Sequence, residues 1–449
     1  MPYTQSSDPA ERLPLRMPNI RRLMDCGTTF TRAATNSPLC VPARACLALG
    51  QDYERCGAWN NDFCCPLDRP TFYRVLRDGG YEVSGAGKFD LHKPIMYWGE
   101  DGWLEQLGTL GFTRAIENEG KGDAVWAFRH GQSGPYGSFL HRDGLMEEYC
   151  ADHLRRAKDP TDSAFSNIPA GSYADNWVTK NALSELRAMA QQPAPWFLMV
   201  NFSGPHDPWD VTEEMKRKWE NTAFPIPAEY EGDGERLLSV RQNYAAMLEN
   251  IDRNIGLLLD ELKRLGQYED TLIIYSADHG EMLGDRNRFF KSVPYRPSVH
   301  IPLVISGEGV LSGHVCDELV QLSDLAATIT EAAGLHMPED TDSRSLLPLA
   351  TGKAAPPVRT YQYAALYPHL RERSEPLAGY EEYECCRKRH IAKGGGWRSI
   401  ATKDYKYIEY AETGERELFD LRNDPNERRN IAETNPALVS KFQQAMNER

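Results

Sequence analysis

The sequence of 449 residues lacks the features that mark nucleic-acid-binding and membrane proteins. Its formal net charge is -14 at pH 7, which argues against a general polyanion binder. No apolar run approaches the roughly 20 residues that a membrane helix needs. The opening stretch MPYTQSSDPAERLP contains no apolar signal core. We therefore expect a cytoplasmic protein for the chain as it begins at Met1, with neither nucleic acid nor membrane as a partner.

The cysteines lack the spacing of a metal finger or a disulfide framework. There are ten, with no CxxC pair, and the adjacent pairs Cys64-Cys65 and Cys385-Cys386 are poorly placed for a simple disulfide ladder. This pattern predicts mostly free thiols in a reducing compartment.

What the sequence does contain is an alternation of short apolar runs and amphipathic segments, with 41% hydrophobic residues in all. Its length and composition allow a large buried core. The patterns predict strands over residues 81–87, 196–202, 271–277 and 301–306, and helices over residues 70–78, 237–265 and 322–333. This alternation predicts an α/β fold with a mostly parallel sheet covered by helices on both faces.

The composition and the residue pattern of the chain change after about residue 338. A Pro-rich connector and a charged irregular stretch precede two alternating runs, which read as a hairpin with a Gly-containing turn at residues 412–415. We expect a catalytic α/β domain over residues 1–340. Residues 341–449 are expected to form a small α+β subdomain with an antiparallel hairpin and a terminal helix.

Polar side chains follow three of the predicted strands directly. Lys88 comes after YEVSGAG, His206 lies just past WFLMVNF, and Asp278 and His279 follow TLIIYSA. Ligands of open α/β sheets bind outside the carboxyl ends of the strands. The joint placement of these residues predicts one functional site at that edge of the sheet.

A cysteine near a helix start offers a candidate nucleophile. In NSPLCVPARACLALG (residues 36–50), Pro42 suits the first helical position and Gly50 can close the helix. Cys40 thus lies near a helix N-terminus, which favours an anion, and Arg44 projects from the same face. The spacing alone is equally consistent with a buried structural cysteine.

The run Cys40-Val41-Pro42-Ala43-Arg44 resembles the C-x-P-x-R signature of the sulfatase family within the alkaline phosphatase superfamily. Other family segments follow the same order, and the resemblance extends from Pro18 to about Ile431. The matching stretches are MPNIRRLMDCGTTFTRA, GAGKFD, SGPHDPW, YSADHGEMLGD, KSVPYRPSVHIPLVI, and DYKYIEY with ELFDLRNDPNERRNIA.

The resemblance implies a role for each matching residue. Cys40, oxidised to formylglycine by a maturation enzyme and then hydrated, would attack sulfur, and the second hydroxyl of the hydrate would later expel sulfate. Arg44 would stabilise the hydrate, while Lys88 and Lys291 would neutralise sulfate oxygens. His206 would contact the sulfate or protonate the leaving oxygen.

The resemblance also implies a metal. Asp278 and His279, with the hydrate of Cys40, would hold a divalent ion that polarises the ester. Ca²⁺ is the expected ion, with Mn²⁺ and Zn²⁺ as alternatives.

The sequence departs from the family pattern in two places. The family usually has histidine two residues after the strand-end lysine, whereas this chain has Asp90 there and a histidine only at His92; we expect His92 to take that catalytic role, with Asp90 as the alternative. The family also begins with an apolar strand ending in aspartates that complete the metal site. No such strand precedes this start, so we expect a truncated chain rather than a substitution by Asp8.

The most consistent function is hydrolysis of a sulfate ester, the substrate being a small molecule or a carbohydrate. A phosphonate monoester or phosphodiester hydrolase shares the signature and is the first alternative. A catalytically inactive, truncated member that retains the anion pocket is the second. The basic cluster at residues 387–390 reads as a solvated charge run, or as a loop that grips an anionic polymer.

Overall fold

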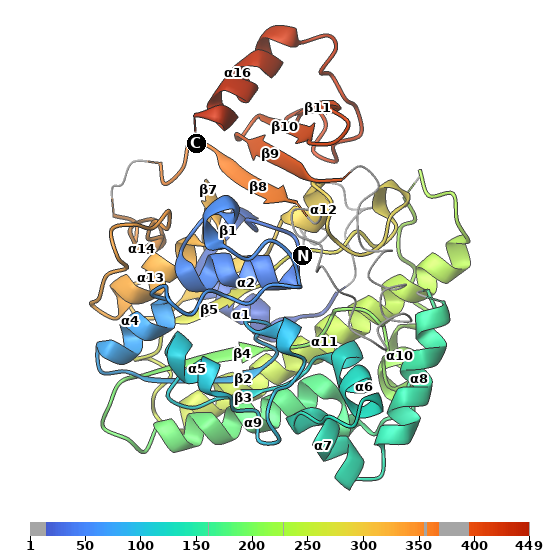
Figure 1. Ribbon diagram of the computed structural model, residues 1–449, viewed down its shortest axis with the longest axis vertical. Coiled ribbons are helices and arrows are strands. Elements are labelled where there is room, and N and C mark those ends of the chain that lie inside the picture. The colour runs from blue at the N-terminus through green and yellow to red at the C-terminus, as the bar shows by residue number, and fades with distance from the viewer. Residues whose placement is uncertain (1–14, 160, 228, 354–356, 368–394, 449) are drawn as a thin grey trace.

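The computed structural model describes residues 15–159, 161–227, 229–353, 357–367 and 395–448 (Figure 1). Asp8 and the basic cluster at residues 387–390 lie outside the described residues. Within the described residues, no helix combines the length and apolarity needed to cross a membrane.

The strands of the described residues form three sheets. The first has the order β5-β6-β1-β7, the second β3-β2-β4 and the third β11-β10-β9-β8. The second sheet is parallel, β1 and β7 are parallel, and β6 runs antiparallel to both of its neighbours. The bounds are β1 Gly27–Ala34, β2 Glu82–Gly87, β3 Ile116–Glu117, β4 Trp196–Asn201, β5 Ile273–Ser276, β6 Leu303–Ser306, β7 His314–Gln321, β8 Gln362–Leu366, β9 Trp397–Ala401, β10 Tyr405–Tyr410 and β11 Arg416–Asp420.

Helices cover the first two sheets. Helix α9 packs on β2 and β4, α11 packs on α9 and α1, and α13 packs on α2 and α4. The bounds of the α-helices are α1 Pro18–Asp25, α2 Cys40–Leu49, α3 Tyr53–Cys56, α4 Phe72–Asp78, α5 Glu105–Leu110, α6 Lys121–Arg129, α7 Pro135–Arg142, α8 Met146–Lys158, α9 Ala174–Met189, α10 Glu213–Trp219, α11 Gly234–Arg264, α12 Arg296–Val299, α13 Asp324–Ala332, α14 Leu347–Ala350 and α16 Pro436–Asn447. Short 3₁₀ turns lie at Lys93–Ile95, Ala170–Ser172 and Asp285–Asn287.

The predicted α/β class is confirmed, and the four strands and three helices predicted from patterns all form. Their ends shift by a few residues; for example, α11 begins at Gly234, where Asp233 accepts hydrogen bonds from the first turn. The predicted hairpin is β10 and β11, paired from Tyr405↔Asp420 to Glu409↔Arg416.

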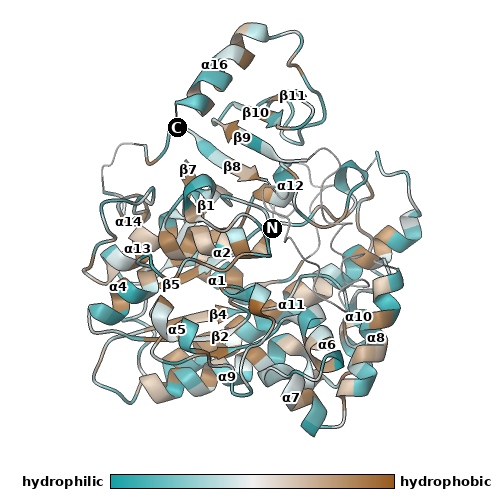
Figure 2. Ribbon diagram, viewed as in Figure 1, coloured by the Kyte–Doolittle hydropathy of each residue, from teal (hydrophilic) through white to brown (hydrophobic). Residues whose placement is uncertain are grey.

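Helix α2 lies at the centre of the molecule and is apolar over most of its surface (Figure 2). Every residue of it is buried except Arg44, which is half-buried. A helix that is hydrophobic all round is stable only inside a core. The one charged side chain of α2 therefore has to find partners inside the protein.

The third sheet and α16 form the top of the molecule in Figure 1. The aromatic ring of Phe442 from α16 stacks on Tyr407 of β10 with centroids 6.2 Å apart. Trp397 Nε1 of β9 donates a hydrogen bond of 3.0 Å to the carbonyl oxygen of Ser292. This sheet therefore contacts the segment around Ser292 directly, while the predicted domain boundary at residue 340 stays a prediction.

Candidate active site

Cys40 is the first residue of α2, following the extended N-cap residue Leu39. We expected Pro42 at the first helical position, but the helix begins two residues earlier. Gly50 closes it with φ of 63°, a left-handed conformation that glycine adopts without a Cβ penalty. The thiol is 1% exposed and lies at the helix end that favours negative charge.

Three strands deliver polar residues to this helix end, as predicted. Strand β2 leads to Lys88, β4 to the loop carrying His206, and β5 to Asp278 and His279. The backbone N–H of Lys88 donates to the carbonyl of Asn201, the last residue of β4, at 3.1 Å. The parallel pairing of β2 and β4 thus places both strand ends at one edge.

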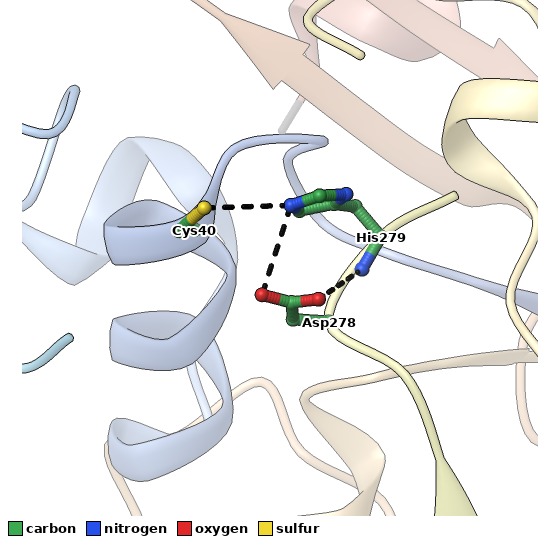
Figure 3. A group of neighbouring side chains, drawn as sticks. All are labelled: Cys40, Asp278 and His279. Atoms are coloured by element: carbon green, nitrogen blue, oxygen red, sulfur yellow. Dashed lines mark hydrogen bonds and ion pairs between the residues drawn. The ribbon is translucent and has the colours of Figure 1, made fainter. Parts of the chain in front are cut away.

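Cys40, Asp278 and His279 form a compact cluster (Figure 3). Cys40 Sγ lies 3.5 Å from His279 Nε2, which lies 3.7 Å from Asp278 Oδ2. One ligand atom from each residue falls within 4.8 Å of the others. His279 Nδ1 faces the carbonyl of Gly280 at 2.9 Å, so the proton of a neutral ring sits on Nδ1 and Nε2 is free to bind a metal.

Arg44 fixes the carboxylate of this cluster. Its Nε and Nη2 atoms each lie 3.0 Å from Asp278 Oδ2, and the backbone N–H of His279 donates to Oδ1. Burial raises the pKa of Asp278, but the charges of His279 and Arg44 outweigh burial and lower it to about 2. Asp278 is therefore an anion at any neutral working pH.

Lys88 lies between a sulfur and a carboxylate. Its Nζ is 3.9 Å from Cys40 Sγ and 3.0 Å from Asp90 Oδ2. His92 instead pairs with Glu117, its Nε2 being 2.5 Å from Oε2, and both side chains are buried. The contacts thus bring Asp90, rather than His92, to the lysine and favour the alternative interpretation of this position.

Lys291 and His206 contact each other near Cys40. Lys291 Nζ contacts His206 Nε2 and lies 3.8 Å from Asp207 Oδ1. His206 Nδ1 lies 2.6 Å from the carbonyl oxygen of Asp207. Burial and the charge of Lys291 lower the pKa of His206, which favours a neutral ring that accepts from the lysine at Nε2.

The surrounding charges change the pKa of the Cys40 thiol. Burial alone raises the pKa of Cys40, but the charges of Lys88 and Lys291, together with the neighbouring imidazoles of His206 and His279, lower it well below its ordinary value. Reactive cysteines occur in such electropositive surroundings, whereas structural cysteines in apolar surroundings are inert. Cys46, also in α2, shows the contrast, because burial and neighbouring Cys56 raise its pKa well above the ordinary value.

Sequence reasoning missed two residues near the site. Asp207 stands in the quoted motif SGPHDPW, so its position beside His206 was a usable signal. Lys121 carried no such signal. It is buried at the start of α6, and its Nζ donates to the carbonyls of His206 and Pro208 and to Asp210 Oδ1 at 3.0, 3.1 and 2.6 Å. It therefore holds the loop that presents His206.

Comparison with known families gives two matches that together cover most of the chain. The Sulfatase family profile matches residues 9–335. A second profile, N-sulphoglucosamine sulphohydrolase, C-terminal, matches residues 284–449.

Individual proteins are similar over nearly the whole chain. The choline-sulfatase of Rhizobium meliloti (strain 1021) is 27% identical over 93% of this chain and 78% of its own length. Human arylsulfatase K is 24% identical over 96% of this chain and 77% of its own length. Among solved structures, the phosphonate monoester hydrolase from Silicibacter pomeroyi superposes with a TM-score of 0.78 at 24% identity, covering 97% of this chain and 90% of that one.

Proposed function

Because the chain belongs to the sulfatase family, we propose that it is a sulfuric ester hydrolase whose nucleophile is carried by the side chain of Cys40. The observation that carries this proposal is the convergence of lysines, histidines and a carboxylate from separate segments around one buried thiol. Oxidised to formylglycine, this side chain supplies a geminal hydroxyl for attack on sulfur.

Lys88 and Lys291 carry the positive charges that would bind the sulfate oxygens. Lys88 Nζ lies 3.9 Å from Cys40 Sγ, and the charges of both lysines lower the pKa of Cys40. Ammonium groups fixed in a buried site stabilise charge that spreads over the oxygens in the transition state. We assign them this role.

The His206–Lys291 pair could supply the proton that the leaving alcohol needs. With its Nδ1 proton directed at the carbonyl of Asp207, His206 accepts from Lys291 at Nε2. The ammonium is then oriented by the imidazole, and we assign to this pair the protonation of the leaving oxygen.

A divalent ion fits the cluster of Cys40, Asp278 and His279 in part. Asp278 supplies a charged oxygen and His279 an available Nε2, with the oxidised Cys40 side chain as a third donor. Ca²⁺ takes 6–8 oxygen ligands, so these residues leave several positions to substrate, water or other donors; Mn²⁺ and Zn²⁺ accept imidazole more readily. Bound here, the ion would polarise the ester oxygen.

The ion pairs of the site are a further reason to propose a metal. Arg44 pairs with Asp278, Lys88 with Asp90, and Lys291 lies near Asp207. Each of these cations thus has a carboxylate neighbour, and Asp90 also pairs with Lys93. A divalent ion would add positive charge to which an anionic ester could bind.

Substrate hydrolysis tests the proposal. After co-expression with a formylglycine-generating enzyme, the protein is assayed with aryl sulfate, aryl phosphonate, sulfated sugars and choline sulfate, the last because of the similarity to a choline-sulfatase. We expect sulfate esters to give the highest kcat/KM. A preference for the phosphonate would identify the alternative hydrolase, and no turnover with any ester, together with no bound metal, would indicate the inactive member.

A further inference from the structure

The contact between His206 and Lys291 joins two loops that are far apart in the sequence. His206 lies in the loop after β4, and Lys291 lies in the segment between β5 and α12, 85 positions later. Because a misplacement of about 1 Å in an active site can cost about 10²-fold in rate, the two loops have to be held at a fixed separation.

The backbone on both sides of Lys291 has a conformation that few residues adopt. Phe290 and Ser292 have φ of 69° and 73°. Left-handed backbone is uncommon for residues other than glycine, and it persists only where the surrounding structure holds it. The backbone N–H of Phe290 donates to Glu281 Oε1, and that of Ser292 donates to the carbonyl of Pro38 at 3.1 Å. The position of Lys291 therefore depends on contacts made by its two neighbours.

An aromatic contact joins this segment to the loop of His206. Trp209 lies three residues after His206, and Phe290 directly precedes Lys291. The rings of Trp209 and Phe290 are stacked, with centroids 5.9 Å apart and planes 5° from parallel. Trp209 is fully buried. Since aromatic pairs prefer a limited set of offset geometries, the stack constrains both the distance and the direction between the two loops.

The loop on the Trp209 side is held from behind. Asn243 of α11 donates through Nδ2 to the carbonyl of Trp209 at 2.8 Å. Lys121 donates to the carbonyls of His206 and Pro208. The indole is therefore fixed to the body of the protein, and the ring of Phe290 packs on a fixed surface.

We propose that the Trp209–Phe290 stack positions Lys291 against His206 for protonation of the leaving oxygen. This inference rests on the proposed function of the His206–Lys291 pair. Both aromatic residues are positioning residues, since they act through the pair and not on the substrate. Loss of the stack should slow the reaction most where the leaving oxygen most needs a proton.

The dependence of the rate on the leaving group tests this role in the converted enzyme. We expect Trp209→Leu to lower kcat/KM for phenyl sulfate by about tenfold more than for 4-nitrophenyl sulfate, whose leaving group needs little protonation. Trp209→Phe keeps an aromatic ring and should show a smaller difference. A general loss of folded protein would lower both rates by the same factor.

Phe290 provides an independent variant of the same contact. Phe290→Leu should give the same selective loss with phenyl sulfate. Because both substitutions remove one contact, the double variant should lose no more than the worse of the two single variants. Independent, additive losses would show that the two rings do not act together.

The aromatic pair of Trp219 and Phe224 is a matched control. Its centroids are 5.8 Å apart, and both rings are buried in the same hydrophobic cluster as Trp209. Trp219 ends α10, whereas the loop of His206 precedes that helix. We expect Trp219→Leu to change kcat/KM for the two esters by the same factor, with circular dichroism confirming that each variant folds.

Amide hydrogen exchange of the unconverted protein tests the contact without turnover. We expect Trp209→Leu to speed exchange in residues 288–292 by about tenfold or more, and Trp219→Leu to leave this segment unchanged. If the parent protein hydrolyses neither ester, the proposed function fails, and exchange alone then decides whether the stack holds the segment of Lys291. Unchanged exchange there, or equal losses with the two esters in Trp209→Leu, would overturn the proposal.

Discussion

Arg44 and Asp278 are 234 positions apart in the sequence, yet two guanidinium nitrogens of Arg44 lie 3.0 Å from the same carboxylate oxygen of Asp278. The contact joins the first turns of α2 to the end of β5. It fixes the position of the carboxylate relative to Cys40, and it keeps that carboxylate ionised.

Replacing Arg44 by lysine should therefore impair the site although the charge is kept. One ammonium cannot reproduce the planar contact of the guanidinium, which also donates to the carbonyl of Lys88. We expect kcat/KM to fall by at least about tenfold. The control is Arg21→Lys, because Arg21 forms an exposed pair with Asp25 and should tolerate the change. Equal activity of the two variants would show that the geometry of Arg44 is unimportant.

Removing either site lysine should lower kcat strongly. We expect Lys88→Ala and Lys291→Ala each to reduce kcat by roughly 10²-fold or more, as for other groups that stabilise transition-state charge. Lys180→Ala, on the exposed face of α9, serves as the control. A normal kcat in Lys88→Ala or Lys291→Ala would remove that lysine from the catalytic machinery.

The C-terminal sheet should stabilise the segment that carries Lys291. In Trp397→Phe, the Ser292 carbonyl loses its donor, and a buried unsatisfied group costs about 1–3 kcal/mol. Trp98→Phe is the matched control, because the Trp98 indole is also buried and its Nε1 has no hydrogen-bond partner among the described residues. Denaturant unfolding should show the larger loss in Trp397→Phe; the reverse order would contradict the importance of this bond.

The main features of the site could be predicted because they depend on local patterns. Strand ends carry Lys88 and Asp278, and a short signature marks Cys40; both signals are contiguous in sequence. The role of Lys121 could not be predicted, because it depends on contacts with a loop 85 residues away. The choice between Asp90 and His92 could not be predicted either. It depended on the pairing of His92 with Glu117, and Glu117 comes from a different strand, β3. Similarly, the split between β4 and β5 is a property of sheet order, which strand patterns do not encode.

The buried carboxyl of Glu119 should make stability depend on pH. Burial raises the pKa of Glu119 from 4.5 to about 7, although the backbone N–H groups of Gly137 and Tyr136 lower it in part. The folded state therefore binds a proton more tightly than the unfolded chain. The associated stability is fully present below pH 4.5 and is lost as the pH rises through about 7.

Glu119→Gln should remove this contribution. We expect the free energy of unfolding of the variant to fall less between pH 4.5 and 7 than that of the parent protein. Urea unfolding at several pH values measures the difference. Parallel pH profiles for the two proteins would mean that Glu119 titrates normally in the folded state.

The identity of the nucleophile is tested most directly by combining peptide mass spectrometry with turnover of an aryl sulfate. Protein made with the maturation enzyme should carry an aldehyde in place of the thiol at Cys40, while Cys46, six residues later in α2, should remain a thiol. Cys40→Ala should abolish sulfate release, and Cys46→Ala should retain it. Full sulfate release by Cys40→Ala would contradict the assignment of Cys40 as the nucleophile.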